Sequence, residues 1–80
     1  MDIPVIKNIV EKYSLEDLQA AEEAMMEEQE PLIQIDGKDE GEQLTHVLAA
    51  IWIKKHMAES GESVGKAVRA YSVKVRKSIS

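Results

Sequence analysis

The sequence predicts an all-α protein, a four-helix orthogonal bundle around a central apolar helix at residues 44–59, with one short extended segment at residues 32–35. The first observation is the unbroken apolar run VLAAIWI at residues 47–53, which is too long for a short strand and too short for a membrane span. The second is that apolar residues recur at helical spacing on both sides of this run, so the flanking helices should wrap it. The third is the length of 80 residues, which predicts a single helical domain, 1–80.

The first helix is expected to be short and amphipathic, with about ten residues after Asp2. Asp2 suits an N-cap, and Pro4 lies in the first turn, where its missing N–H costs nothing. The residues expected to face inward are Ile3, Ile6, Ile9, Val10 and Tyr13.

The second helix is expected to follow Ser14 and to run to about Gln29. Ser14 and Asp17 match a capping box with Asp in place of the usual Glu, while Tyr13 and Leu18 occupy the positions of a hydrophobic staple. The inward side chains should be Leu15, Leu18, Ala21 and Met25. The outer face is acidic and comprises Glu22, Glu23, Glu27 and Glu28.

Pro31 is expected to stop the second helix, and the extended segment LIQI at residues 32–35 follows it. Asp36-Gly37 is a hairpin signal, yet no second strand comes next. Three arrangements remain open for this segment: it pairs with the C-terminal part of the chain, it pairs with a copy of itself, or it lies extended over the core.

The central helix has Asp39 as a candidate N-cap and Gly61 as a candidate left-handed C-cap. Ser63 is expected to cap a fourth helix at residues 64–79. Its inward stripe would comprise Val64, Ala67, Val68, Tyr71, Val75 and Ile79. The alternation within residues 71–79 also suits a strand, and a helix is preferred because the stripe continues through it.

Charge is unevenly distributed along the chain. Residues 1–42 hold 13 acids and 3 bases, a net of −10, whereas residues 43–80 hold 7 bases and 2 acids, a net of +5. Such a split favours packing of the acidic half against the basic half, within one molecule or between like molecules, although ordinary solvated faces would look the same.

Composition narrows the function classes. The chain has no cysteine, which excludes disulfides, thiolate metal sites and a thiol nucleophile. The N-terminal sequence MDIPVIKNIVEK does not have the pattern of a signal peptide, so a soluble cytoplasmic protein is expected. No phosphate-binding glycine loop, nucleophile elbow or carboxylate pair in an apolar setting is present, so neither an enzyme nor a cofactor is expected.

The two histidines are candidate metal ligands. His46 and His56 lie ten residues apart, about 15 Å along a helix, and cannot share an ion within one chain. Glu42 and His46 could supply two ligands at i and i+4, but no third ligand is evident. The simpler expectation for His46 is a hydrogen-bonded residue on the helix surface.

Several residues are candidates for contacts with a partner. Trp52 is either core or an interaction anchor, for which tryptophan is well suited. Polar side chains at the start of the central helix, such as Gln43, either meet a partner or satisfy the end of the 32–36 segment. The full candidate set is Trp52, Glu42, Gln43, His46, His56, Lys66, Arg69 and Arg76.

The segments IPVIKNIVEKYSLEDLQAAEEAM and EGEQLTHVLAAIWI resemble a small bacterial domain of unknown function, with residues 40–46 as the most distinctive part. The likeness covers nearly the whole chain and carries no assigned activity. The resemblance implies that members are encoded near thioredoxin-like and peroxiredoxin proteins and have a redox-associated accessory role. In a chain without cysteine such a role would act through binding.

The leading hypothesis is therefore a non-catalytic protein–protein interaction or accessory module that self-associates, as a homodimer, or binds a cytoplasmic protein partner. One alternative is an anion-binding module that grips nucleic acid or a membrane surface with the basic face of the last helix. Against it, the whole chain is acidic and that face lacks aromatic residues, so neither nucleic acid nor membrane is the expected partner. The other alternative is a small metal or ligand site at Glu42 and His46.

Overall fold

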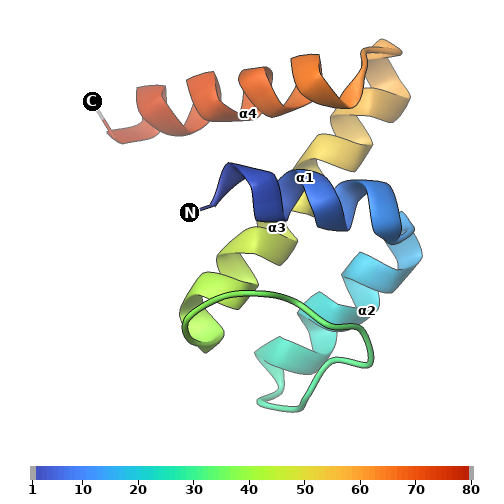
Figure 1. Ribbon diagram of the computed structural model, residues 1–80, viewed down its shortest axis with the longest axis vertical. Helices are drawn as coiled ribbons and strands as arrows, with labels where there is room; N and C mark the ends of the chain where they lie inside the picture. Colours follow the sequence, from blue (N-terminus) through green and yellow to red (C-terminus); the bar gives the residue numbers. More distant parts are fainter. Residues whose placement is uncertain (1, 80) are drawn as a thin grey trace.

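The computed structural model describes residues 2–79, and this part of the chain contains four helices and no strand. The helices are α1 (Ile3–Lys12), α2 (Leu15–Met26), α3 (Glu40–Ser60) and α4 (Val64–Ile79). The helix α3 is central because it contacts each of the other three, and α1 and α4 cross it steeply (Figure 1). The prediction of an all-α bundle around a central helix is confirmed.

The core lies around α3, which is buried on most of its circumference. Val47, Ala50 and Ile53 are fully buried although they point in different directions around the helix. Within the apolar run Leu48 is exposed, with 43% of its surface open to solvent, and Trp52 is half-buried. The remaining core residues are Ile6, Ile9, Val10, Leu18, Ala21, Ile35, Ala49, Ile51, Ala67 and Val68.

The predicted N-cap of the central helix at Asp39 is confirmed, and the helix extends one turn before the apolar range 44–59. The helix begins at Glu40, because the Asp39 side chain accepts the N–H of Glu42 at 2.8 Å and caps it. At the other end Gly61 has φ 73 and its N–H donates to the carbonyl of Met57, so the expected left-handed C-cap is confirmed.

The predicted end of the second helix at Gln29 is also wrong, since α2 ends at Met26. Glu28 has a left-handed backbone conformation, φ 60, and donates its N–H to the carbonyl of Met25. The N–H of Gln29 returns to the carbonyl of Ala24 at 2.8 Å. These two bonds form a Schellman motif, which ends the helix before any proline is reached.

The other N-caps predicted from the sequence are confirmed. Ser14 and Asp17 exchange both hydrogen bonds of the capping box. Asp2 caps α1, and the Ser63 hydroxyl accepts a backbone N–H from the first turn of α4. These signals are local in sequence, which is why they could be identified without tertiary information.

The C-terminal segment is helical through residue 79, so the strand alternative for residues 71–79 is wrong. Its expected inward stripe faces α1 and α3, with Ala67 and Val68 buried and Tyr71 half-buried. The side chain of Ile79, the last member of that stripe, lies outside the described part of the structure.

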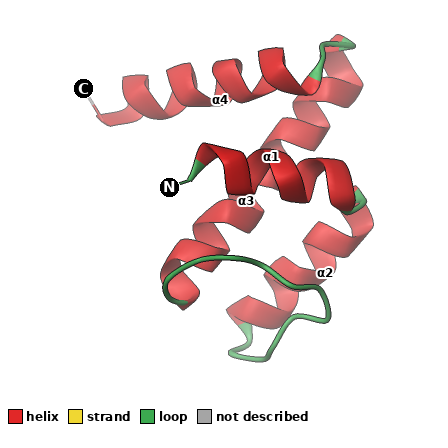
Figure 2. Ribbon diagram, in the orientation of Figure 1, coloured by secondary structure: helices red, strands yellow, loops and turns green. Residues whose placement is uncertain are grey.

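The loop between α2 and α3 passes across the bundle between the end of one helix and the start of the other (Figure 2). The segment 32–35 within it forms no strand and instead lies over the core, with Ile35 buried. The Tyr13 hydroxyl donates to the carbonyl of Gln34 at 3.5 Å, whereas Leu32 is fully exposed. Within the chain this segment therefore lies extended over the core and does not pair with the C-terminal part.

Candidate interaction surfaces

His46 is fully buried and does not lie on the helix surface as expected. Its Nδ1 lies 2.8 Å from the carbonyl oxygen of Asp36, and its Nε2 lies 3.1 Å from the backbone N–H of Asp2. A carbonyl can only accept and an N–H can only donate, so Nδ1 carries the proton and Nε2 accepts. His46 therefore joins the N-terminus, the loop and α3, and neither ring nitrogen is left to bind a metal with Glu42.

Gln43 supports the same loop from the first turns of α3. Its side-chain amide donates to the carbonyl of Gly37 at 3.4 Å. Gly37 is required for this close approach, because a Cβ added there would lie 2.8 Å from Cγ of Gln43. Gln43 therefore holds the loop just after the 32–36 segment, whereas Thr45 bonds within its own helix, to the carbonyl of Gly41.

Trp52 belongs to an aromatic cluster between α3 and α4. The ring of His56 stacks on Trp52 with centroids 4.9 Å apart, and Tyr71 of α4 packs against Trp52 at 5.5 Å. The Nε2 atom of His56 lies 2.6 Å from a carboxylate oxygen of Glu62. This bond lowers the pKa of Glu62 below its ordinary value, and burial raises the pKa of Tyr71. Trp52 is half-buried, so it is partly core and partly available to a partner.

The outer face of α4 is basic, as the sequence predicted. Lys66, Arg69 and Arg76 are exposed and fall within about 80° of arc on the helix. Val73 lies on the same face and is 49% exposed, so the basic face has an apolar centre. We call this surface, made by Lys66, Arg69, Val73 and Arg76, the basic face.

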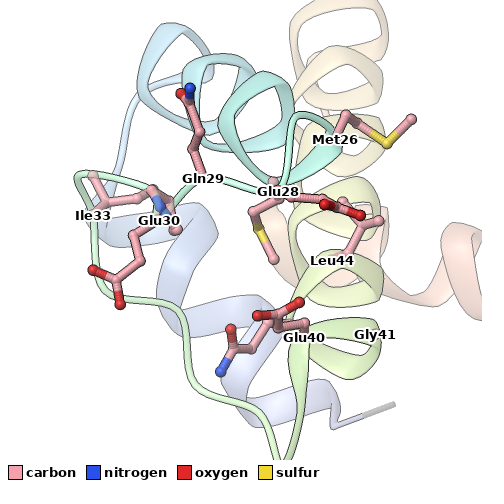
Figure 3. Close-up of a pocket in the computed structure, with 11 residues that line it drawn as sticks. Met26, Glu28, Gln29, Glu30, Ile33, Glu40, Gly41 and Leu44 are labelled. Carbon is pink, nitrogen blue, oxygen red and sulfur yellow. The ribbon is translucent and has the colours of Figure 1, made fainter.

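A groove of about 710 Å³ lies between the end of α2, the following loop and the start of α3. Its lining residues are Met25, Met26, Glu28, Gln29, Glu30, Pro31, Ile33, Glu40, Gly41, Gln43 and Leu44. The exposed carboxylates of Glu28, Glu30 and Glu40 lie around its opening (Figure 3). No Lys, Arg or His is among the described residues that line it. We call this surface the acidic groove.

Apolar side chains in and beside the groove are open to solvent. Met26 projects from the end of α2 and is 68% exposed (Figure 3). Leu44 lines the groove, and Leu48, one turn further along the same side of α3, is also exposed. The groove was not predicted from the sequence, because helical periodicity does not show whether Met26, Leu44 and Leu48 are covered by neighbouring elements. The signal that could have indicated it was the density of acids beside two adjacent methionines.

The acidic groove and the basic face belong to different parts of the molecule. The helix α2 contacts α3, whereas α2 and α4 do not contact each other, and they lie toward opposite ends of the bundle in Figure 1. Packing of acidic α2 against basic α4 within one chain, which the charge split had allowed, therefore does not occur.

The described residues provide neither a metal cluster nor a membrane-spanning helix. No group of three or more His, Asp or Glu side chains is placed to hold a metal ion in residues 2–79. In the same residues, none of the helices combines the length and apolar character needed to cross a membrane.

Comparison with known proteins gives one match. The model of a protein family described as "Family of unknown function (DUF6952)" matches residues 1–80. No curated protein and no solved structure matches the chain. The resemblance to a small uncharacterised domain is thereby confirmed.

Proposed function

The chain belongs to DUF6952, a family of unknown function, and we propose that it is a non-catalytic protein–protein interaction or accessory module that self-associates as a homodimer in the cytoplasm. The observation that carries this proposal is the separation of charge. The helix α2 contains acids and no base, while most bases of the second half lie on α4, and the two helices do not touch. The acidic surface of α2 and the basic surface of α4 can therefore each attract the oppositely charged surface of another molecule.

The strength of this attraction depends on the number of charges. A single exposed ion pair contributes only about 0–1 kcal/mol, so no individual pair would hold two molecules together. Clusters of charges of one sign, however, produce electric fields that speed association and select the partner by its charge. Because the charges concerned are exposed, the association should weaken as salt shortens the Debye length from about 10 Å at 0.1 M to about 3 Å at 1 M.

Sedimentation velocity over a range of protein and salt concentrations tests the proposal. A species larger than the 9.0 kDa monomer is expected at low salt, with dissociation as sodium chloride is raised. Trp52, the single tryptophan, gives a second signal, because its emission should change with protein concentration if its exposed edge is covered. A monomer at every salt concentration, up to millimolar protein, would refute self-association.

A second candidate is an anion-binding module, favoured by the exposed bases gathered on one face of α4. Such a face could contact phosphates of nucleic acid or an anionic membrane. Titration of the protein with duplex DNA, RNA and anionic vesicles at low salt distinguishes this candidate. Binding that is lost in Arg69→Glu/Arg76→Glu would support it, and no binding at low salt would remove it.

A further inference from the structure

From the two complementary surfaces we infer that the acidic groove is the docking site for the basic face of α4 from a second copy of this chain. This inference rests on the proposed self-association and specifies the two surfaces that meet. Both surfaces carry apolar side chains that are at least partly open to solvent beside charges of one sign, and the signs are opposite.

The groove offers an apolar floor with an acidic border. Leu44 and Ile33 line it from opposite sides, and both are half-buried, so each keeps surface that a partner could cover. Glu28, Glu30 and Glu40 are exposed at its border. Apolar contact would add to the binding free energy, and the carboxylates would attract and orient the partner.

The basic face presents the matching pattern on one rigid helix. Lys66 and Arg76 are about 15 Å apart along α4, and Val73 lies between them. Val73 is exposed although it belongs to a helix with a well-buried inner stripe, so it contributes nothing to the core of its own chain. Contact with the groove would remove this side chain, and those of Met26 and Leu44, from water.

The basic face is the surface of α4 that remains available. The opposite side of this helix packs on α1 and α3, with Ala67 and Val68 buried there. A second copy can therefore approach the basic face without unfolding any part of the bundle. If the contact occurs twice across a two-fold axis, a standard interface needs about 800 Å² from each subunit, which is a modest part of the 5452 Å² surface.

Charge reversal tests the pairing directly. The reversed-helix variant is Arg69→Glu/Arg76→Glu, and the reversed-groove variant is Glu28→Lys/Glu30→Lys. Each variant alone would place like charges together, so each should be monomeric at concentrations where the wild type associates. An equimolar mixture should associate again, because each acidic helix now meets a basic groove and each basic helix meets an acidic groove.

A matched control is Glu11→Lys/Glu16→Lys, which changes net charge by the same amount as the reversed-groove variant at exposed positions outside both surfaces. This control should associate like the wild type. Val73→Ala removes apolar surface without changing charge and should weaken association about tenfold. Circular dichroism of each variant shows whether the fold is retained.

The outcomes separate this inference from the proposed function. If the wild type associates but the two reversed variants associate equally well, the groove and helix pairing is overturned and self-association stands. If the control dissociates as strongly as the reversed-groove variant, net charge alone is responsible and the pairing is again overturned. If the wild type is monomeric throughout, the proposed self-association fails and this inference fails with it.

Discussion

Replacing His46 should be among the most damaging single changes to the stability of this protein. The ring is fully buried and bonds to the Asp36 carbonyl on one side and the Asp2 N–H on the other. His46→Ala removes two hydrogen bonds at about 1 kcal/mol each. The cavity left by the ring adds about 2–3 kcal/mol, as for other large-to-small changes at buried sites.

The expected loss is therefore about 4–5 kcal/mol, against a total stability of about 4–12 kcal/mol for a domain of this size. Urea denaturation followed by circular dichroism measures this loss, and the melting temperature should fall by more than about 15 °C. His46→Leu is similar in volume and removes only the hydrogen bonds, so it should cost about 2 kcal/mol.

The matched control is His56→Ala, because this histidine and its partner Glu62 are both partly exposed, so water can replace the lost hydrogen bond. It should cost about 1 kcal/mol or less, from a partly exposed ion pair and ring stacking. If His46→Ala were no more destabilising than His56→Ala, the bridging role of the buried ring would be wrong. Nitrogen chemical shifts that placed the proton of His46 on Nε2 would contradict the hydrogen-bond assignment as well.

Three further changes should have measurable effects. Glu28→Gly should raise the free energy of unfolding by about 1 kcal/mol, because Gly adopts the left-handed conformation at φ 60 without the steric cost of a Cβ; an unchanged urea midpoint would contradict this. Gly37→Ala should lower the free energy of unfolding by about 1–3 kcal/mol, because its Cβ would lie 2.9 Å from the backbone nitrogen of Gln43. A thermal melt equal to that of the wild type would mean that the loop relaxes freely. The pKa of Glu62 is lowered from 4.5, chiefly by its hydrogen bond with His56. The stability that this bond contributes is therefore present above pH 4.5, and it is lost as the pH falls through the lowered folded-state pKa. Carboxyl titration by NMR should show a return toward 4.5 in His56→Ala, and an unchanged titration would show that another group is responsible.

Helix positions and inner faces could be predicted because they depend on local chemistry. A capping box such as that of Ser14 and Asp17 is complete within four residues. The inner stripe of α4 repeats with the period of a helix, so a helix was correctly preferred to a strand for residues 71–79. Helix ends were less predictable, since the C-terminus of α2 uses a left-handed Glu28 where glycine is the usual signal.

His46 shows what periodicity alone leaves open. It precedes Ala50 and Ile53 at the i, i+4, i+7 spacing of a buried stripe, so its position on the inner side was available in the sequence. Its two hydrogen-bond partners could not be identified from the sequence, because Asp2 and Asp36 come from distant parts of the chain. Burial of a polar ring depends on such partners, and only the folded chain supplies them.

By itself, the sequence determined the all-α class, the central apolar helix and the residues that share each helical face. Only the tertiary structure decided that α2 and α4 stay apart, that His46 is enclosed, and that Met26, Leu48 and Val73 remain open to solvent. The physical reason is that a helix's periodicity states which side chains point the same way, whereas neighbouring elements decide which of those sides are covered. The acidic groove and the basic face are thus products of packing, formed where the bundle leaves apolar and charged surface uncovered.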